Sequence, residues 1–345
     1  MMQAIYIESH GRDDSALLGD MAVPEPGPGE VRVRIASAAF NRVDLYMRDS
    51  GAGITHELPL ILGVDGAGVV DAPGEGVTGI GTGDRVVIYP VIYCGECEFC
   101  VRGDQMLCLR CRIVGEHRHG TFAEYACVPA HNLYPLPDDL SFDEAAVLPT
   151  AYLTAWRMVV TQGEVQPAET VLIHGIGGGV ATAALQIVKL VGGRAIVTSS
   201  SDAKLAAARA LGADELVNYR DHDVVEAVMA MTEGRGVDAV IENVGDATWA
   251  TSLRALRRGG RIVTCGATTG SQPGADLQRV FIRQLRIIGS TIGNRDEFRA
   301  LLRAVGQQRI RPVIDKVFSL DQGLEALGYL EAGHQVGKLV LRVDG

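Results

Sequence analysis

The spacing of apolar residues changes about midway along the chain. Before residue 147, apolar and polar residues alternate in short stretches such as Val31–Ile35, and turn-forming segments such as 24–29 separate these stretches. Alternation with a period of two is typical of strands with one buried face, and glycine and proline mark the turns between them. The pattern therefore predicts a β-rich region over residues 1–146.

Beyond residue 147, short apolar runs alternate with stretches of helical periodicity. The run 171–174 leads into a glycine cluster at 175–179, and apolar residues then recur at helical spacing from 180 to 191. Alternating strands and helices predict an α/β fold, with a Rossmann-type doubly wound parallel sheet over 147–294. Residues 295–345 are expected to return to the first domain. Further strands are predicted at 195–198, 215–218, 238–241, 261–264 and 286–289, with helices at 202–211 and 224–231.

Composition and charge narrow the classes of partner. The chain has 345 residues, 47% of them hydrophobic, which suits a globular protein of about two domains. Its net charge of -10 argues against a nucleic-acid partner, because the phosphate backbone requires a basic surface. No apolar stretch reaches the ~18 residues of a membrane-spanning helix, and the N-terminal residues lack a secretory signal pattern. We therefore expect no membrane partner and a cytoplasmic location.

Four closely spaced cysteines form a candidate metal site. Cys94, Cys97, Cys100 and Cys108 follow the spacing C-x2-C-x2-C-x7-C among polar, turn-forming residues. Thiolates at this spacing can close a tetrahedron around one Zn²⁺, and four sulfur ligands leave no open position, so the ion would be structural. Cys111 is an alternative fourth ligand. The other cysteines do not suggest a disulfide framework, which favours a reducing compartment.

The glycine cluster after the run 171–174 matches part of the dinucleotide-binding pattern G-x-G-x-x-G. Gly175 and Gly177 fit the first two glycines, but Val180 occupies the last position. In this pattern the glycines let the backbone approach a pyrophosphate, and the helix N-terminus binds its charge. A glycine-rich turn without a ligand is the alternative. The βαβ pattern that follows favours a dinucleotide site, with contacts from Gly177, Gly178, Gly179 and Val180.

The end of the second strand of the predicted sheet bears on the choice of cofactor. An acidic residue there would bind a ribose 2′-hydroxyl and repel a 2′-phosphate. Ser199 and Ser200 occupy this place, and Lys204 follows. Hydroxyls and an ammonium group favour NADP(H) over NAD(H). The alternative is that Ser201 or Asp202 only caps the next helix.

These features together resemble the medium-chain dehydrogenase/reductase superfamily over essentially the whole chain, and most closely its quinone oxidoreductase-like members. The resemblance implies a GroES-like catalytic domain over 1–146 that includes the zinc loop 94–108, a Rossmann domain over 147–294, and a C-terminal return over 295–345. It also implies a cleft between the domains that holds NADPH. The segments that carry it are 41–46, 63–70, the cysteine loop, 120–125, 153–156, 211–214, 218–219 and 243–245.

The chain departs from the zinc-dependent alcohol dehydrogenases of this superfamily at their catalytic metal. Those enzymes carry cysteine where this chain has Asn41, a His-Glu pair where it has Val64 and Asp65, and a further ligand near 149–151. Without zinc as a Lewis acid, a simple ketone loses several kcal/mol of transition-state stabilisation. A quinone or an α,β-unsaturated carbonyl delocalises the charge, so that hydrogen bonds suffice.

We therefore predict an NADPH-dependent quinone or enone reductase without catalytic zinc. Two alternative hypotheses stay open: an alcohol dehydrogenase with an atypical site, and a cofactor-binding protein without redox activity. Apolar Ile287 and Ile288 near the last strand of the Rossmann sheet predict a homodimer, with a tetramer as the alternative.

By the same resemblance, Asn41, Asp44 and Tyr46 line the nicotinamide end of the cleft. His117, in the turn 115–120, is a candidate proton donor, and a solvated turn is the alternative. His174 is expected to be a core residue. Tyr219 and Lys338 are candidate partners of the adenosine half of the cofactor. The remaining residues that the resemblance places on the cofactor are Thr154, Asn243, Gly245 and Gly266.

Overall fold

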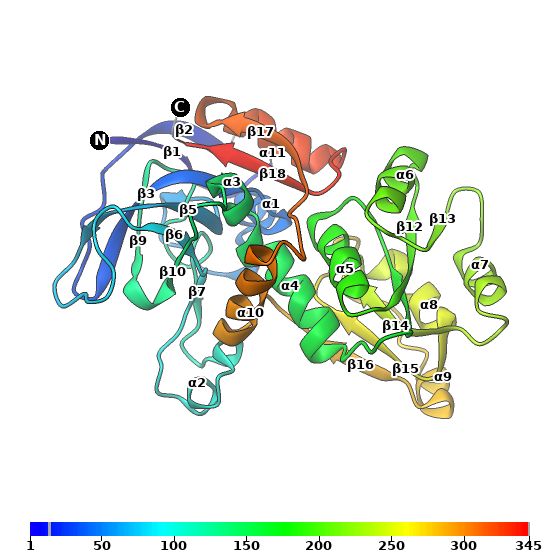
Figure 1. Ribbon diagram of the computed structural model, residues 1–345. Helices are drawn as coiled ribbons and strands as arrows, with labels where there is room; N and C mark the ends of the chain where they lie inside the picture. The colour runs from blue at the N-terminus through cyan, green and yellow to red at the C-terminus, as the bar shows by residue number, and fades with distance from the viewer. Residues whose placement is uncertain (13–14, 344–345) are drawn as a thin grey trace. The chain divides into compact units, whose positions relative to one another are not determined.

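A computed structural model describes residues 1–12 and 15–343, and the chain forms two compact units (Figure 1). Unit 1 comprises Met1–Ala151, Asn294–Gly306 and the chain from Ile314 onward. Unit 2 comprises Tyr152–Gly293 and Gln307–Val313. The segment 307–313, which we expected in the C-terminal return, packs with unit 2, where the backbone N–H of Val313 donates to the hydroxyl of Tyr152 at 2.8 Å.

Unit 2 contains a six-stranded sheet in which every neighbouring pair is parallel. The strand order corresponds to 3-2-1-4-5-6 in chain order, which is the Rossmann arrangement, and it confirms the predicted doubly wound sheet. In spatial order the strands are β13 (Glu215–Asn218), β12 (Arg194–Ser199), β11 (Thr170–Ile173), β14 (Val237–Glu242), β15 (Leu256–Thr264) and β16 (Arg286–Gly289). The helices are α4 (Leu153–Trp156), α5 (Gly179–Leu190), α6 (Asp202–Ala210), α7 (Val224–Met231), α8 (Asp246–Ala255) and α9 (Leu277–Arg283).

The central strands of this sheet are buried on both faces. Leu172, Ile196, Val240 and Ile262 have no exposed surface and form one hydrophobic cluster. A parallel sheet covered by helices on both faces requires continuous apolar strands rather than alternating ones. This is why the strands of unit 2 appear in the sequence as short, unbroken apolar runs.

Unit 1 is built around a large sheet that combines strands from the first 135 residues with two strands near the C-terminus. β18 pairs antiparallel with β3 and parallel with β17, so the C-terminal strands extend the sheet that contains β3 (Figure 1). The large sheet has the order β10 (Leu133–Pro135), β6 (Arg85–Ile88), β5 (Asp65–Pro73), β3 (Glu30–Ala39), β18 (Lys338–Arg342) and β17 (Ile314–Ser319), and β9 (Tyr125–Pro129) also pairs with β3. Smaller sheets contain β1 (Met2–Ile7), β2 (Ala16–Met21) and β4 (Leu60–Ile61), and β7 (Val91–Ile92) with β8 (Arg112–Ile113).

Helices of unit 1 cover this β-rich core. α10 packs through Phe298, whose ring lies 5.0 Å from that of Tyr134 between centroids. The core also holds Phe40 and Phe122, with ring centroids 4.6 Å apart. The helices are α1 (Arg42–Asp49), α2 (Glu98–Val101), α3 (Phe142–Ala146), α10 (Arg295–Gly306) and α11 (Gly323–Ala332). Within residues 1–12 and 15–343, none of the helices has the length and apolar character that a membrane crossing requires.

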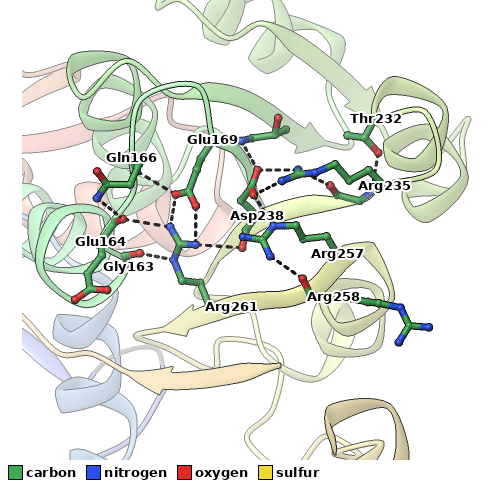
Figure 2. Close-up of polar contacts among 12 residues, drawn as sticks. Gly163, Glu164, Gln166, Glu169, Thr232, Arg235, Asp238, Arg257, Arg258 and Arg261 are labelled. Atoms are coloured by element: carbon green, nitrogen blue, oxygen red, sulfur yellow. Dashed lines mark hydrogen bonds and ion pairs between the residues drawn. The ribbon is translucent and has the colours of Figure 1, made fainter. Parts of the chain in front are cut away.

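An ion-pair network joins the N-terminal ends of strands in unit 2 (Figure 2). Asp238 accepts hydrogen bonds from Arg235 at 2.7 and 3.0 Å, from Arg257 at 2.6 Å and from the backbone of Thr170 at 2.9 Å. Arg261 donates to both carboxylate oxygens of Glu169. These contacts lie where the strands begin, whereas ligands of parallel sheets bind beyond the carboxyl ends of the strands. The network therefore stabilises the sheet away from its binding edge.

Candidate functional site

The four predicted zinc ligands come together in the loop between β7 and β8. The ligand atoms of Cys94, Cys97, Cys100 and Cys108 all lie within 4.8 Å of one another, and the sulfurs of Cys94 and Cys100 are 3.8 Å apart. A tetrahedral Zn²⁺ with Zn–S bonds of about 2.3 Å separates its sulfurs by roughly 3.8 Å. The cluster therefore fits one structural Zn²⁺.

Backbone N–H groups support thiolates in this loop. Cys97 donates to the sulfur of Cys94, and Cys94 and Arg110 donate to the sulfur of Cys108, each at 3.3 Å. Hydrogen bonds from the backbone of Glu96 and Cys97 lower the pKa of Cys94 to about 5. Cys111 stands outside the cluster, and burial raises the pKa of its thiol to about 11. Cys108 rather than Cys111 is the fourth ligand of the site.

A second polar cluster lies buried in unit 1, at the end of β3. Ala39 pairs with Asp65 of β5 on one side and with Val340 of β18 on the other. This register brings Asn41, which follows β3, close to Asp65 and to Lys338. Thr150, from the short π-helix Leu148–Tyr152, completes the cluster through its hydrogen bond to Asp65. These residues are far apart in sequence, and strand pairing brings Asn41, Asp65 and Lys338 together.

Hydrogen bonds use most of the polar atoms of this cluster. Asp65 accepts from the amide of Asn41 at 2.9 Å and from the hydroxyl of Thr150 at 2.6 Å. The ammonium group of Lys338 donates to the carbonyl of Phe40 at 2.6 Å and to the amide oxygen of Asn41. The second amide N–H of Asn41 donates to the carbonyl of Ala39 at 3.2 Å. The amide of Asn41 therefore orients its neighbours and has no N–H left for a substrate oxygen.

Burial shifts the pKa values of Asp65, of Lys338 and of the nearby Asp44. It raises the pKa of Asp65, and Lys338 opposes this shift. It lowers the pKa of Lys338, and Asp65 opposes that shift in turn. Asp44 is fully buried; burial raises its pKa to about 8, although the backbone N–H of Asn41 donates to it at 2.6 Å. Its other carboxylate oxygen is buried without a hydrogen-bond partner.

The structure separates Tyr46 from this cluster. Tyr46 lies two residues beyond Asp44 on α1, so that helix geometry places the two side chains about 200° apart. Its side chain is 37% exposed, and its charged neighbour is Arg42.

His117 lines a cavity of about 320 Å³ in unit 1. Its Nδ1 accepts from the backbone N–H of Ile113 at 3.2 Å, so in the neutral ring the proton is on Nε2. His56, His119 and Arg112 line the same cavity. Next to His117 in the chain, burial raises the pKa of Glu116 to about 7. Glu116 was not among the predicted site residues, although its position beside His117 in the turn 115–120 indicates it.

The predicted cofactor turns lie beyond the carboxyl ends of the strands of unit 2. Gly175 and Gly177 have positive φ angles of 66° and 109°, and Gly178 precedes α5 without a side-chain cap on its N-terminus. Gly177 and Gly178 therefore belong to the turn that leads into α5, and Gly179 and Val180 are the first two residues of that helix. A second turn follows β14, where a Cβ on Gly245 would lie 2.3 Å from the carbonyl oxygen of Gly270.

Two buried polar atoms close to these turns lack partners, the amide oxygen of Asn243 and the hydroxyl of Thr182. Gly266 follows β15, and Thr154 lies buried in α4. Glycine backbone, an uncapped helix N-terminus and unsatisfied polar atoms fit a bound dinucleotide.

Ser199 is the last residue of β12, Ser200 and Ser201 follow it, and Tyr219 follows β13. Ser199 accepts from the backbone of Ser201 at 3.2 Å, and Ser201 caps α6 at the backbone of Lys204. Asp202 accepts from Asn218 at 2.8 Å. Ser200 lies between the two serines that make these contacts, and Tyr219 is 52% exposed.

Lys338 was predicted to contact the adenosine half of the cofactor. It belongs to unit 1 and contacts Asn41, so the structure places it with the catalytic candidates and not with Tyr219 and the serines of unit 2.

Family models match both units. Residues 27–138 match the alcohol dehydrogenase GroES-like domain, and residues 179–307 match the zinc-binding dehydrogenase domain. A zinc-type alcohol dehydrogenase-like protein of Schizosaccharomyces pombe is 36% identical over 324 residues, which is 92% of each chain. The chain belongs to the medium-chain dehydrogenase/reductase superfamily.

Solved structures of this superfamily match nearly the whole chain. The crystal structure of an NAD-dependent alcohol dehydrogenase is 44% identical, with a TM-score of 0.96 over 99% of this chain and 100% of that one. The 2-octenoyl-CoA carboxylase reductase CinF, solved with NADP and 2-octenoyl-CoA, is 29% identical, with a TM-score of 0.90 over 99% of this chain and 87% of that one. The protein is an oxidoreductase of the medium-chain dehydrogenase/reductase type, with a GroES-like and a Rossmann domain.

The sequence resemblance places the catalytic zinc ligands of the alcohol dehydrogenases at Asn41, at Val64 and Asp65, and near 149–151, and these positions carry different chemistry here. Asn41 offers an amide, Val64 a hydrocarbon and Thr150 a hydroxyl, and the carboxylate of Asp65 is already bonded to Asn41 and Thr150 and paired with Lys338. Zinc in proteins takes thiolate, imidazole and carboxylate ligands, and the ammonium group of Lys338 would repel a cation in this place. Over residues 1–12 and 15–343, the cysteine loop is the only cluster of three or more candidate ligands close enough to share an ion. A catalytic zinc therefore does not fit this site.

Proposed function

We propose that this protein is an NADPH-dependent reductase that transfers hydride to a quinone or an α,β-unsaturated carbonyl compound without catalytic zinc. The observation that carries the proposal is the buried cluster of Asn41, Asp65, Thr150 and Lys338 at the catalytic zinc position of the superfamily. The residues there bind one another and leave no ligand set for a metal.

The charge that forms during reduction decides which substrate suits such a site. Reduction of a simple ketone localises negative charge on one oxygen, which zinc normally stabilises by several kcal/mol. A quinone or an enone spreads this charge into a phenolate or enolate. A small number of hydrogen-bond donors then suffices, so such a substrate does not need the metal.

Different residues of unit 1 have separate roles in the proposed reaction. The nicotinamide cofactor, when bound, supplies the hydride. His117 lines the 320 Å³ cavity, carries its proton on Nε2 in the neutral ring, and is the candidate donor to the substrate oxygen. Glu116, whose pKa is raised to about 7 by burial, is a second carrier of a proton in the same turn. Asn41 and Lys338 hold the buried cluster at the end of β3 in one arrangement.

The preference for NADPH rests on the ends of β12 and β13. Ser199, Ser200 and Lys204 offer hydroxyls and a positive charge for a 2′-phosphate. Asp202, the acidic residue closest to the strand end, is held by Asn218 at 2.8 Å. The complex of CinF with NADP and an enoyl-CoA supports this assignment, whereas the NAD-dependent alcohol dehydrogenase among the relatives favours the alternative.

The test is NADPH and NADH oxidation with a panel of quinones, enones and simple ketones, combined with the zinc content of the same preparation. We expect turnover of quinones or enones, a preference for NADPH, and one zinc per chain. Ketone or alcohol turnover with two zinc ions per chain would overturn the proposal in favour of an alcohol dehydrogenase. Tight cofactor binding without turnover on any acceptor would favour a non-redox role.

We further propose that the protein works as a homodimer in the cytoplasm. The cysteines are all unpaired, which suits a reducing compartment. β16 forms an edge of the unit 2 sheet, and the side chain of Ile287 on it is 43% exposed. An exposed apolar edge strand can pair with a second copy across a two-fold axis.

A further inference from the structure

A chain of buried hydrogen bonds lies beneath the two cofactor turns of unit 2. His174 follows β11, and the register of the sheet places it between Thr198 of β12 and Glu242 of β14. The four residues Thr198, His174, Ser252 and Glu242 are at most 1% exposed. We expected His174 to be a core residue, and it is buried, but both of its ring nitrogens are engaged in polar contacts.

Glu242 forms one end of this chain. Its Oε1 accepts from the backbone N–H of Val244 at 2.8 Å and of Gly245 at 3.2 Å. Its Oε2 accepts from the hydroxyl of Ser252 at 2.6 Å, and Thr248 donates to both oxygens at 2.8 and 2.9 Å. The backbone N–H groups of Val244 and Gly245 thus tie the 244–245 turn to the side chain of Glu242.

The direction of the remaining bonds follows from Glu242. Ser252 uses its one hydroxyl proton on Glu242, so it must accept from Nε2 of His174, which lies 3.1 Å away. Burial lowers the pKa of His174, although Glu242 opposes this shift, so the ring is neutral and its Nδ1 is an acceptor. The hydroxyl of Thr198 donates to this Nδ1 at 3.3 Å.

Thr198 forms the other end of the chain. Its hydroxyl oxygen accepts from the backbone N–H of Gly175 at 3.4 Å, and its carbonyl accepts from Ile176 at 2.9 Å. An unbroken, directed chain therefore runs from the glycine turn at 175–176, through Thr198, His174 and Ser252, to Glu242 and the turn at 244–245.

We propose that His174, as the neutral Nε2–H tautomer, is a positioning residue that holds the glycine turn and the 244–245 turn in one relative arrangement, so that both halves of a nicotinamide dinucleotide bind together. The inference rests on the proposed cofactor role of these turns and is independent of which substrate is reduced. Each link is a single hydrogen bond inside an apolar core, where an unpaired partner is costly. Removing the imidazole would release the turns from one another without removing a cofactor contact.

The test compares a whole cofactor with a fragment of it by calorimetric titration of the full-length protein. Adenosine 2′,5′-bisphosphate occupies only the adenosine end, whereas NADPH spans both turns. In His174→Phe we expect NADPH to bind about tenfold more weakly and the fragment to bind within twofold of the unmodified protein. NADH and AMP serve as the matching pair if the protein prefers NAD, so an error in the proposed cofactor does not hide the result.

Further variants test whether His174 positions the two turns or only stabilises the fold of unit 2. Thr198→Val and Ser252→Ala each remove one link, and we expect each to weaken NADPH several-fold, with little further loss in the His174→Phe background. Thr232→Val removes a hydroxyl at the opposite edge of the sheet and should leave binding unchanged. The ¹⁵N chemical shifts of the His174 ring should report the Nε2–H tautomer.

Three results would overturn the proposal. The first is an equal fold-change for NADPH and the fragment, which indicates general loosening of unit 2. The second is unchanged NADPH binding in folded His174→Phe, and the third is an Nδ1–H tautomer. Failure of quinone or enone turnover would count against the proposed function and would leave these binding results intact.

Discussion

The ammonium nitrogen of Lys338 lies 3.6 Å from a carboxylate oxygen of Asp65, and the two side chains are 3% and 0% exposed. A charge this deeply buried is tolerated only when it is paired and hydrogen-bonded. Lys338 thus places its charge next to Asn41, the residue at which the sequence resemblance expects a zinc ligand in the alcohol dehydrogenases. The pair stabilises the fold and is the feature on which the proposal of a zinc-free site rests.

Removing one partner of this pair should be strongly destabilising. Lys338→Met leaves Asp65 without a counter-charge, and we expect a loss of about 3–5 kcal/mol of unfolding free energy. Adding Asp65→Asn in the same chain should recover a large part of this loss. Differential scanning calorimetry measures both effects. Lys316→Met, which removes an exposed lysine 3.5 Å from Glu325, is the control and should cost less than about 1 kcal/mol. An equal effect of the two lysine variants would contradict the role of Lys338.

The cysteine loop should hold one zinc ion and lose it when a ligand is removed. We expect Cys100→Ser to abolish zinc binding and to expose the loop 94–108 to proteases, because a structural zinc contributes folding energy locally. Cys111→Ser, which changes a cysteine outside the cluster, should retain the ion. Elemental analysis and limited proteolysis measure these outcomes. Zinc loss in Cys111→Ser with retention in Cys108→Ser would reverse the ligand assignment.

The network of Figure 2 should make the protein sensitive to acid. Burial raises the pKa of Asp238, but hydrogen bonds from Arg235 and Arg257 outweigh it and hold that pKa well below the usual range. The folded pKa is thus below the unfolded one, so the stabilisation is present above the unfolded value and is lost as the pH falls. We expect Asp238→Asn to cost about 2 kcal/mol at pH 7, with the difference shrinking below about pH 5.

Thermal unfolding of both chains across this pH range provides the measurement for Asp238. Asp296→Asn breaks an exposed pair with Arg299 and should change stability by less than about 1 kcal/mol at every pH. A constant difference between Asp238→Asn and the unmodified protein from pH 7 to pH 3 would show that the carboxylate charge is not what stabilises the strands.

Lys204 should contribute to the binding of NADPH and not to the binding of NADH. Lys204→Ala removes a positive charge near the predicted 2′-phosphate site, and we expect the KM for NADPH to rise about tenfold while the KM for NADH stays the same. Lys316→Ala, on unit 1, is the control. Steady-state kinetics with both cofactors gives the answer. A parallel rise for both cofactors would assign Lys204 to stabilising α6 instead of to selecting the cofactor.

The edge of the unit 2 sheet should mediate self-association. We expect Ile287→Lys on β16 to convert the dimer into monomers, because a charge on an edge strand opposes pairing with a second copy. Size-exclusion chromatography with light scattering measures the mass. Leu109→Lys, in the zinc loop at a side chain that is 73% exposed, is the matched control. Monomers from Leu109→Lys and dimers from Ile287→Lys would move the interface to the zinc loop.

Local spacing alone predicted the Rossmann sheet closely. Strands expected at 215–218 and 286–289 form β13 and β16 with the same bounds, and the helix expected over 224–231 is α7. These elements follow from short-range rules, since a buried parallel strand needs an unbroken apolar run and the glycines between them mark turns. The zinc loop was equally predictable from the sequence, because its ligands lie within 15 consecutive residues, from Cys94 to Cys108.

The polar cluster at the end of β3 depends on contacts between residues that are far apart in the sequence, which residue spacing cannot predict. Asn41 and Lys338 are 297 residues apart and touch because β18 pairs with β3 in one register. Nothing local to Lys338 distinguishes a lysine that binds a cofactor from one that neutralises Asp65. In the same way, His174 appears in the sequence as the end of an apolar strand, and only its hydrogen bonds to Thr198 on β12 and Ser252 on α8 make it a link between two turns.

The sequence by itself determined the order of the elements, the metal-binding loop and the absence of the usual catalytic ligands, because each depends on residue types at short separation. The tertiary structure decided how the substituted site is filled, with Lys338 paired to Asp65 and the amide of Asn41 fully bonded. The physical reason is that buried charge and hydrogen-bond satisfaction are properties of the groups that surround a residue, and strand register chooses those groups from distant parts of the chain.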